Sequence, residues 1–338
     1  MSSLLIERVS DEAGARRWHA VAEAALAHDF VGLPQDPVEE LFPSLAGEVG
    51  GERIELWLGS VSGVAVAIAQ VELPLLDNTG TALFELMVHP EHRRRGYGRQ
   101  LLAHALDRAR ANDRTLVITE IGAPLDGTTR APGEALAESV GAKPVLSEIR
   151  RLLDVPTVDV DVLAGLRAEA LKHSEGYTLV QWVDHAPPEL LEDMAALAAR
   201  MSTDAPLEDM TWEPEVWTAE RYLSKEEEAL ARGRTRVATA VRHEASGRLV
   251  GFTDIGVNAR RPGVAYQWDT IVTHEHRGRR LGLLLKVANL ELLGATVPGV
   301  RYINTWNAAA NAHMVAINDA VGFRPVDRWN GWQLDLPE

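Results

Sequence analysis

The 338-residue sequence contains no cysteine. Its absence excludes disulfide bonds, thiolate metal ligands and a cysteine nucleophile. No uncharged stretch approaches the roughly 18 residues that a membrane-spanning helix needs. The amino terminus also lacks the basic segment and long apolar run of a secretory signal. We therefore expect a soluble, cytoplasmic protein with no membrane partner.

Positive charge is also in short supply. Lysine and arginine number 34 against 49 acidic residues, which gives a formal net charge of −15. Proteins that bind nucleic acids usually carry a basic excess, so this balance argues against nucleic acid as a partner. An acidic surface instead favours cationic small molecules such as amines.

The chain is long enough for two domains of ordinary size. Hydrophobic periodicity predicts a similar order of helices and strands in both halves. We expect an N-terminal domain over 1–154, a linker with one short helix over 155–175, and a C-terminal domain over 176–338. In the first half the pattern indicates helices over 11–28, 37–48, 98–112 and 132–141. In the second half it indicates helices over 187–201, 214–232, 281–293 and 309–321. Strands are expected between these helices.

Two segments align without a gap and support a duplication. The first, "ELMVHPEHRRRGYG" (85–98), aligns with "DTIVTHEHRGRRLG" (269–282). Glu85 then corresponds to Asp269 and Gly98 to Gly282. Each segment leads from a predicted strand through a turn rich in glycine and arginine into a helix.

This arrangement is suited to binding phosphate. Free N–H groups at a helix start, together with the positive end of the helix dipole, attract anions. Glycines let the backbone approach a phosphate closely, and arginines add charge-assisted hydrogen bonds. The alternative is a solvated arginine run above a surface helix. The spacing fits neither a lysine-containing P-loop nor a dinucleotide fingerprint.

The segment "RRRGYG" (93–98) matches the acyl-CoA signature Q/R-x-x-G-x-G/A of the GNAT N-acetyltransferase superfamily. In the second half, "NAHMVAINDAVGF" (311–323) resembles the N-x-x-A-x-x-x-Y-x-x-x-G-F helix of that superfamily. The resemblance covers nearly the whole chain. It implies an α+β (mixed α/β) fold of two consecutive GNAT-like domains, each with a mostly antiparallel central sheet flanked by helices.

The resemblance also implies that acetyl-CoA is the co-substrate, with no metal. The end of the fourth strand of each copy would bind the pantetheine arm, and the basic turn would bind the pyrophosphate. The residues implied in this role are Met87, Val88, Arg93, Arg94, Arg95, Gly96, Tyr97 and Gly98 in the first half, and Ile271, Val272, Thr273, Arg277, Gly278, Arg279, Arg280, Leu281, Gly282, Asn307 and Asn311 in the second. From its position alone, Tyr97 is better explained as a packing residue.

The two halves depart from the pattern in different ways. The first has the better signature, but Ala137 stands where the family has its tyrosine acid. The second has Arg280 in place of a signature glycine and Asn318 in place of the tyrosine. We expect the second half to be catalytic, with Asp269, Asn311 and Asn318 in the site and Glu85 as the counterpart of Asp269. Structural pairing of Asp269 with an arginine is the competing interpretation.

The resemblance implies attack of an amine on the acetyl group through a tetrahedral intermediate. We expect the acceptor to be the primary amine of a small molecule. Residues expected to contact it are Asp204, Glu208, Asp209, Trp212, Trp217 and Trp268. Two alternatives stay open: a non-catalytic acyl-CoA-binding module, and acetylation of a protein or peptide amine. We expect a monomer or a homodimer.

Overall fold

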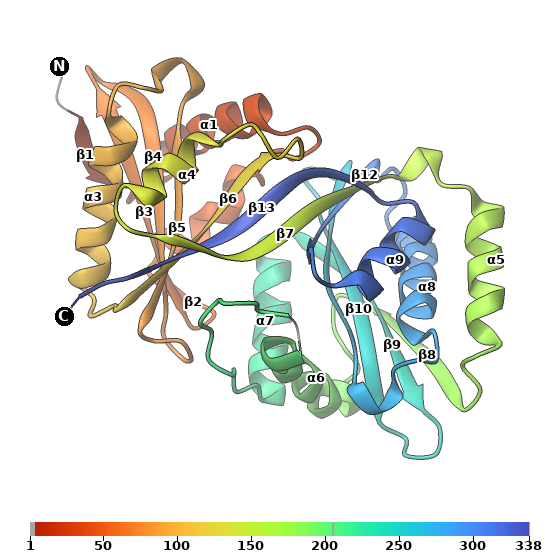
Figure 1. The fold of residues 1–338 in the computed structure, drawn as a ribbon. Coiled ribbons are helices and arrows are strands. Elements are labelled where there is room, and N and C mark those ends of the chain that lie inside the picture. Colours follow the sequence, from red (N-terminus) through yellow and green to blue (C-terminus); the bar gives the residue numbers. More distant parts are fainter. Residues whose placement is uncertain (1–3, 205, 338) are drawn as a thin grey trace. The chain divides into compact units, whose positions relative to one another are not determined.

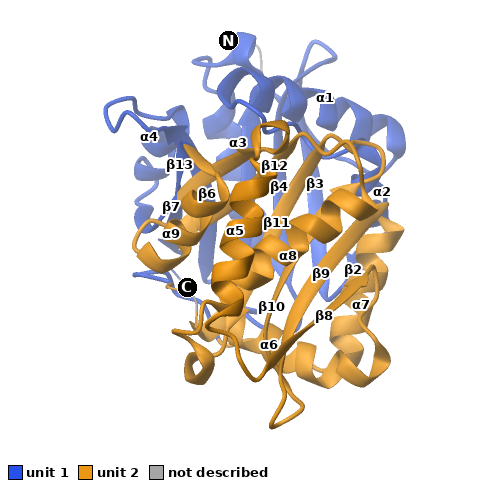
Figure 2. Ribbon diagram, turned by 90° about the vertical axis from the view of Figure 1, so that its right-hand side faces the viewer, with its two compact units in different colours: residues 1–148, 207–213, 326–338 blue, residues 149–206, 214–325 orange. Residues whose placement is uncertain are grey.

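The computed structural model, which describes residues 4–204 and 206–337, divides into two units (Figure 2). Unit 1 comprises residues 1–148, 207–213 and 326–338, and unit 2 comprises residues 149–206 and 214–325. Two segments of unit 1 are therefore far from the rest of it in the sequence. No helix in the described part of the chain is long and apolar enough to cross a membrane.

Unit 1 contains a sheet with helices on its two faces (Figure 1). Its elements are β1 (Leu5–Arg8), α1 (Glu12–Asp29), α2 (Phe42–Leu45), β2 (Glu48–Val49), β3 (Glu52–Val61), β4 (Val64–Pro74), β5 (Thr81–Val88), α3 (Tyr97–Arg110), β6 (Leu116–Pro124), α4 (Pro132–Glu138) and the first part of β7 (Lys143–Asp154). Strands β1, β3, β4 and β5 pair antiparallel in the order β1-β3-β4-β5, and β6 then pairs parallel to β5.

Helices α1 and α3 cover opposite faces of this sheet. Trp18 and Val21 of α1 pack against Leu56 and Ile68 of β3 and β4. Alanines and leucines of α3 pack against β5 and β6 on the other face. The predicted start of α1 is confirmed, because the Asp11 side chain accepts a hydrogen bond from the Gly14 amide at 2.7 Å and caps the helix.

The helix expected over 37–48 is wrong in extent. The segment forms a 3₁₀ turn at Val38–Leu41, the four-residue helix α2 and the short strand β2. Pro43 has no N–H to continue a helix that starts before it. Gly47 adopts a φ of 120°, which ends the helical run after α2.

The last strand of the chain, β13 (Arg324–Asp335), completes the sheet of unit 1. It pairs antiparallel with β6 from Asp327 opposite Pro124 to Asp335 opposite Leu116. The two strands run side by side in Figure 1. The sheet of unit 1 thus contains a strand from the far end of the chain. The expected domain boundaries at 154 and 176 stay a prediction.

From β8 (Tyr177–Val183) onward, unit 2 follows the order of unit 1 without a counterpart of β2, and the extra helix α5 (Val160–Leu171) precedes β8. The other elements of unit 2 are α6 (Leu191–Asp204), α7 (Ala219–Ala231), β9 (Arg234–His243), β10 (Leu249–Asn258), β11 (Val264–Val272), α8 (Leu281–Thr296), β12 (Tyr302–Ala308) and α9 (Ala312–Val321). Strands β8 to β11 pair antiparallel in sequence order, and β12 pairs parallel to β11.

Both faces of the unit 2 sheet are covered. Helices α5 and α8 pack on one face through Leu163, Leu284 and Val287. Helices α6 and α7 pack on the other through Met194 and Tyr222. Every residue of β10 is therefore buried, as expected for a central strand with covered faces.

Lys286 lies inside this packing on α8. Its side chain is 2% exposed and its ammonium lies 5.5 Å from the centre of the Phe323 ring. Burial lowers the pKa of Lys286 to about 7 from its ordinary 10.5. A buried cation costs free energy, so protonation of Lys286 destabilises the folded state.

We expect Lys286→Met to change how stability depends on pH. Because the pKa is lower in the folded state, the unfolded state binds more protons between pH 7 and pH 10.5, and the wild-type protein gains stability as pH rises through that window. The gain approaches about 1.4 kcal/mol per pH unit relative to the variant. Urea unfolding of both proteins at pH 7, 8 and 9 measures it, and parallel curves would contradict the expectation.

Because unit 1 includes residues 207–213 and the strand β13 that pairs with β6, we predict that residues 1–154 do not form a stable unit alone. We expect the isolated fragment to unfold without cooperativity or to aggregate through the exposed edge of β6. As a matched control, the full chain can be cut by a protease at a site inserted near Val158. The two pieces should then co-elute in size-exclusion chromatography. A cooperatively folded, monomeric 1–154 fragment would refute this.

Candidate functional site

The two basic turns have the same backbone conformation. In unit 1, Arg94 and Gly96 adopt positive φ values of 63° and 82°. In unit 2, Gly278 and Arg280 adopt 79° and 55° at the corresponding positions. Glycine and arginine have exchanged places between the copies while the left-handed positions are kept. Arg280 therefore preserves the shape of the turn despite replacing a signature glycine.

Helices α3 and α8 both start at these left-handed residues. Neither Gly96 nor Arg280 caps its helix with a side-chain hydrogen bond. N–H groups in the first turn of a helix need partners. Together with the helix dipole, they form the kind of environment that binds phosphate.

One arginine of each turn ties the turn to two other elements. In unit 1, the Nε of Arg93 donates to the Val88 carbonyl at 3.1 Å, and its terminal nitrogens donate to both carboxylate oxygens of Asp29 at 2.6 and 2.8 Å. Asp29 is the last residue of α1. The arginine thus connects the strand end, the turn and the first helix.

Arg277 makes the same connection in unit 2. Its Nε donates to the Val272 carbonyl at 3.0 Å, and its Nη2 lies 3.3 Å from Asp204 Oδ2. Asp204, expected at the acceptor, is the last residue of α6 and matches Asp29 of unit 1. Because the pairing occurs in both units, it indicates that Asp204 and Arg277 together position the turn.

The other turn residues have various neighbours. Arg95 Nη2 donates to the Glu91 carbonyl at 3.1 Å, and the Arg279 guanidinium lies 5.7 Å over the Tyr177 ring. Tyr97 is buried in a cluster with Val66 and Leu101, which agrees with its expected packing role. Contact of these turn residues with a nucleotide stays a prediction.

Strand β11 separates from its parallel neighbour β12 part of the way along its length. Their pairing covers Val264–Tyr266 opposite Tyr302–Asn304, whereas β11 continues to Val272. In unit 1, β5 and β6 pair over Thr81–Phe84, and β5 continues to Val88. Within the described residues, the ends of both strands therefore have a backbone edge that the sheet ladder does not use. Residues 271–272, and 87–88 in unit 1, lie in these stretches, whereas Thr273 follows β11 and its N–H donates to the Val250 carbonyl at 2.9 Å.

A bulge distinguishes β11 from β5. In β11, Thr270 pairs with Thr253 but Gln267 pairs with Ile255, so Trp268 and Asp269 together stand opposite Asp254. In β5 the register with β4 is regular from Val88 to Leu83. The extra residue of β11 bends the strand and redirects its side chains, as bulges do next to active sites.

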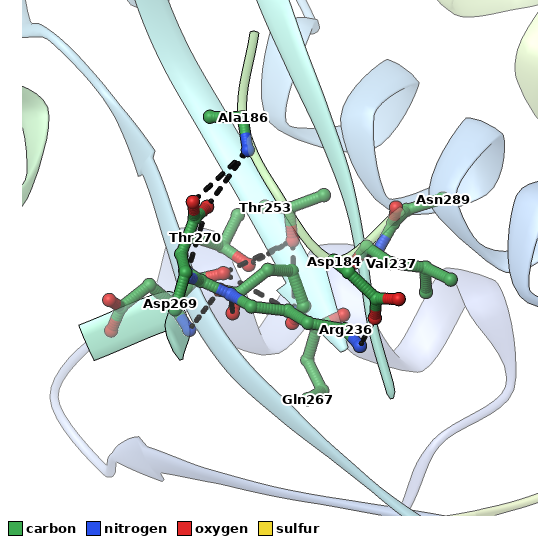
Figure 3. A network of polar contacts seen from close by, with 11 residues as sticks. Asp184, Ala186, Arg236, Val237, Thr253, Gln267, Asp269, Thr270 and Asn289 are labelled. Atoms are coloured by element: carbon green, nitrogen blue, oxygen red, sulfur yellow. Dashed lines mark hydrogen bonds and ion pairs between the residues drawn. The ribbon is translucent and has the colours of Figure 1, made fainter. Parts of the chain in front are cut away.

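A network of polar contacts holds this bulge in place (Figure 3). The Asp269 amide donates to Asp254 Oδ1 at 3.2 Å. The side-chain Nε2 of the buried Gln267 donates to the backbone carbonyls of Asp254 and Asp269 at 2.7 and 3.3 Å, and to the Thr253 hydroxyl at 3.0 Å. These hydrogen bonds hold the backbone of the bulge in place.

Asp254 also pairs with Arg236 of β9. Arg236 Nε donates to Asp254 Oδ2 at 2.6 Å, and its Nη1 lies 3.7 Å from Glu226 of α7. The guanidinium lies 5.4 Å over the Tyr222 ring. Burial alone would lower the pKa of Arg236, but the charge of Asp254 outweighs it and raises that pKa. This places a permanent cation beneath the bulge.

Among the described residues, the Asp269 carboxyl has no arginine partner like that of Asp254. Burial, and then repulsion from Asp254, raise the pKa of Asp269 to about 7, although Arg236 opposes the rise. Glu215 adds further negative charge. A carboxyl with a pKa close to the working pH can take up and release a proton, which suits a general base.

Unit 1 has a carboxyl at the corresponding place without the bulge. Burial, followed by repulsion from Asp36 and Glu120, raises the pKa of Glu85 to about 7. The pKa of Glu148 also rises to about 7, through burial and then through Glu120 and Glu208. Unit 1 thus contains an acidic group but lacks the bonded bulge of unit 2.

The asparagines predicted for the site have packing partners. The Asn311 side chain caps α9 by accepting from the Met314 amide at 3.1 Å. Asn318 is fully buried and its Nδ2 donates to Asn307 Oδ1, while its own Oδ1 has no hydrogen-bond partner. A role of Asn307, Asn311 and Asn318 in catalysis or CoA binding stays a prediction.

The predicted acceptor residues fall in different units. Glu208, Asp209 and Trp212 lie in segment 207–213 of unit 1. There Glu208 accepts from the Ser147 amide at 3.2 Å, and the Asp209 amide donates to Val145. Trp217 and Trp268 lie in unit 2 with Asp269.

Within unit 2, Trp217 bonds Glu215 through its Nε1 at 2.8 Å. The Trp268 side chain is 47% exposed. Sequence reasoning missed Arg236, Asp254 and Glu226, because a charged residue on one strand gives no signal of its partner on the next.

Comparisons with known proteins agree with this geometry. Residues 18–126 match the model of the acetyltransferase (GNAT) family. The chain is 36% identical over 152 residues to a mycothiol acetyltransferase from Thermomonospora curvata, and the alignment covers 44% of each protein. The match therefore spans less than half the length of this curated relative.

Solved structures extend the likeness to the whole chain. A tandem GNAT protein from the clavulanic acid biosynthesis pathway superposes with a TM-score of 0.80 and 29% identity, covering 99% of this chain and 100% of that one. A GCN5-related N-acetyltransferase from Sphaerobacter thermophilus, at 19% identity and a TM-score of 0.66, shares the fold. The predicted fold class, two consecutive domains of this type, is confirmed.

The conserved shape of the turns generates a stability prediction. Arg280 has a left-handed backbone, which costs a non-glycine residue about 1–2 kcal/mol, whereas glycine pays about 0.5–1 kcal/mol in unfolded-state entropy. We expect Arg280→Gly to stabilise the protein by about 0.5–1 kcal/mol in urea unfolding. Arg94→Gly, at the matching left-handed position of unit 1, should act in the same direction.

Arg279→Gly is the matched negative control, because Arg279 does not have a positive φ. It should destabilise the protein or leave it unchanged. Equal effects at positions 279 and 280 would show that backbone strain does not explain the arginine at the turn.

Proposed function

We propose that the chain is a tandem acetyltransferase of the GNAT type, and that unit 2 transfers an acetyl group from acetyl-CoA to the primary amine of a small molecule. The observation that carries this proposal is the bonded bulge at Trp268–Asp269. It presents a carboxyl of raised pKa on a strand whose neighbouring edge is unused by the sheet. The mycothiol acetyltransferase relative supports an acetyl acceptor of low molecular mass.

The residues of unit 2 fit acetyl-CoA. The first turn of α8, which has no side-chain cap at Arg280, would bind the pyrophosphate through backbone N–H groups. The stretch of β11 beyond its pairing with β12, at Ile271 and Val272, would lie along the pantetheine arm, with the Val272 carbonyl bonded to Arg277 and the Thr273 N–H to Val250. Bound there, acetyl-CoA supplies the thioester carbonyl that the amine attacks.

Asp269 acts on the amine. A protonated amine has no free electron pair, so it must lose a proton before it can attack. The Asp269 carboxylate accepts this proton, directly or through a water molecule. Because its pKa is close to 7, the ionised form predominates above neutral pH and remains basic enough to take the proton.

The departing thiolate needs little assistance in this proposal. Asn318 stands where the family pattern has tyrosine, and an amide cannot release a proton at neutral pH. A thiol has an ordinary pKa of about 8.5, so a thiolate is a stable leaving group without protonation. Asn318 would contribute packing and a hydrogen bond to Asn307 rather than acid catalysis.

Unit 1 differs in the feature that carries the proposal. It has the turn and the unpaired strand edge but no bulge in β5. This difference supports the alternative of a non-catalytic acyl-CoA-binding module for unit 1 alone. Acetylation of a protein or peptide amine is the remaining alternative for unit 2.

The decisive test is the pH dependence of thiol release from acetyl-CoA with an amine acceptor. In the wild-type protein we expect kcat/KM to rise with pH through about 7, because Asp269 must lose its proton to act. Asp269→Asn should lower the rate by about 10²- to 10⁴-fold and should remove that rise. Using one amine for both proteins cancels the ionisation of the amine itself.

Glu85→Gln is the matched control in unit 1, and it should retain the rate within about threefold. The reverse result, an active Asp269→Asn and an inactive Glu85→Gln, would move the chemistry to unit 1. If no amine releases thiol while calorimetry detects acetyl-CoA binding, the binding-module alternative is correct. Asp269 is a better test than Arg277, whose loss would also free Asp204 and disturb the turn.

A further inference from the structure

Three aromatic side chains form a row beside the bulge of unit 2. The Tyr266 ring stacks with the Trp268 ring at 5.6 Å between centroids and 28° between planes. It also stacks with the Trp306 ring of β12 at 6.3 Å and 17°. We name Tyr266, Trp268 and Trp306 the aromatic shelf.

The shelf continues onto the neighbouring strand through a glycine. Gly256 of β10 pairs with Tyr266, and the indole of Trp268 lies over it. A Cβ added at Gly256 would stand 2.7 Å from Trp268 Nε1, closer than such atoms approach. The absence of a side chain at Gly256 is therefore what lets the indole lie against the sheet.

The shelf lies on the same face of the sheet as the proposed catalytic group. Directly paired residues share a face, and so do alternate residues along a strand. Arg236, Gly256 and Tyr266 are aligned across β9, β10 and β11. Arg236 packs against Tyr222 of α7, so the shelf faces the side of α7. The bulge adds Asp269 next to Trp268 on this side.

Trp268 is the exposed member of the shelf, Tyr266 and Trp306 are half-buried, and charge of both signs lies beside the shelf. Trp268 is 47% exposed, and large aromatic side chains are usually covered. Asp269 and Glu215 supply negative charge near one end. The Arg234 guanidinium lies 5.7 Å from the centre of the Trp268 ring and supplies positive charge.

Among the described residues, β5 of unit 1 has no aromatic row on the matching face. Leu83 and Glu85 stand there, in regular register with β4. The aromatic pair of unit 1, Phe30 and Trp329, lies over Gly122 of β6 instead. Aromatic residues on this face of the fourth strand therefore accompany the bulge. This association points to a function in the reaction of unit 2 rather than to the stability of the fold.

We infer that the aromatic shelf binds a ring of the acetyl acceptor while Asp269 receives its amine. The acceptor would be a primary amine attached directly or by a short chain to a ring with an apolar flat face, either an aromatic ring or the CH face of a sugar. Both rings stack on indole, and the adjacent carboxylates attract the ammonium group. This inference rests on the proposed function of unit 2 and specifies its substrate class.

The test compares three acceptors with one another: tyramine for the aromatic ring, glucosamine for the sugar and n-butylamine for no ring. Thiol release gives kcat and KM for each with the wild-type protein and with Trp268→Ala. We expect a lower KM for at least one ring-bearing amine than for n-butylamine. Trp268→Ala should raise the KM of that amine by about 2- to 12-fold and leave n-butylamine within about twofold.

A second variant tests the shelf without removing an aromatic residue. Gly256→Ala should displace the Trp268 indole and raise the KM of the ring-bearing amine in the same direction. Gly263→Ala is its matched control, because a Cβ there meets nothing within 4 Å. It should leave every KM unchanged. Thermal unfolding of each variant verifies that the fold is intact.

Calorimetry of amine binding without acetyl-CoA separates the shelf from the reaction. Binding of the ring-bearing amine that survives in Asp269→Asn but weakens in Trp268→Ala supports the shelf, even if no amine is acetylated. Thiol release that is equal for all three amines and unaffected by Trp268→Ala overturns the shelf and leaves the proposed function standing. If none of the three amines is bound or acetylated, both the shelf and the proposed function are overturned, whereas turnover of n-butylamine alone overturns only the shelf.

Discussion

The candidate site depends on a single carboxylate, that of Asp254. One of its oxygens accepts from Arg236 at 2.6 Å and the other from the amide of Asp269 at 3.2 Å. The first contact compensates a buried arginine, and the second fixes the backbone of the bulge. Removing one partner of a buried ion pair commonly costs about 3–5 kcal/mol because the other charge remains without compensation. Asp254 thus connects the buried charge of Arg236, on the sheet face toward α7, to the bulge of β11.

The two copies show how a duplicated unit can keep one part of a site and change another. The turns retain two left-handed residues each, even though glycine and arginine have exchanged places between Arg94–Gly96 and Gly278–Arg280. Both also retain an arginine tied to the last residue of the first helix. The strands have diverged, because only β11 among the two gains the extra residue at its centre. Conserved turns with divergent strands fit a cofactor site whose acceptor side is specific to unit 2.

Much of this was predictable from local sequence. The Asp11 cap, the order of helices and strands, the alignment of Glu85 with Asp269 and the packing of Tyr97 all follow from short-range patterns. The helix expected over 37–48 was wrong in extent because Pro43 and Gly47 interrupt it. Glu208, Asp209 and Trp212 are expected to contact the acceptor, and the structure assigns them to segment 207–213 of unit 1. Their contact with the acceptor stays a prediction, and only the tertiary structure shows that this loop belongs to a different unit from its flanking helices.

Spacing along the chain was sufficient for the turn, the helix starts and the candidate base, because each depends on residues within a few positions of one another. Long-range pairing was required for everything that gives the candidate base its environment. The Arg236–Asp254 ion pair joins residues on neighbouring strands, and the stack of Tyr266, Trp268 and Trp306 crosses two of them. The bulge itself exists only as a difference in register between β10 and β11. A register is a relation between two strands, so neither strand contains it alone, and the fold had to bring them together before Asp269 acquired its raised pKa.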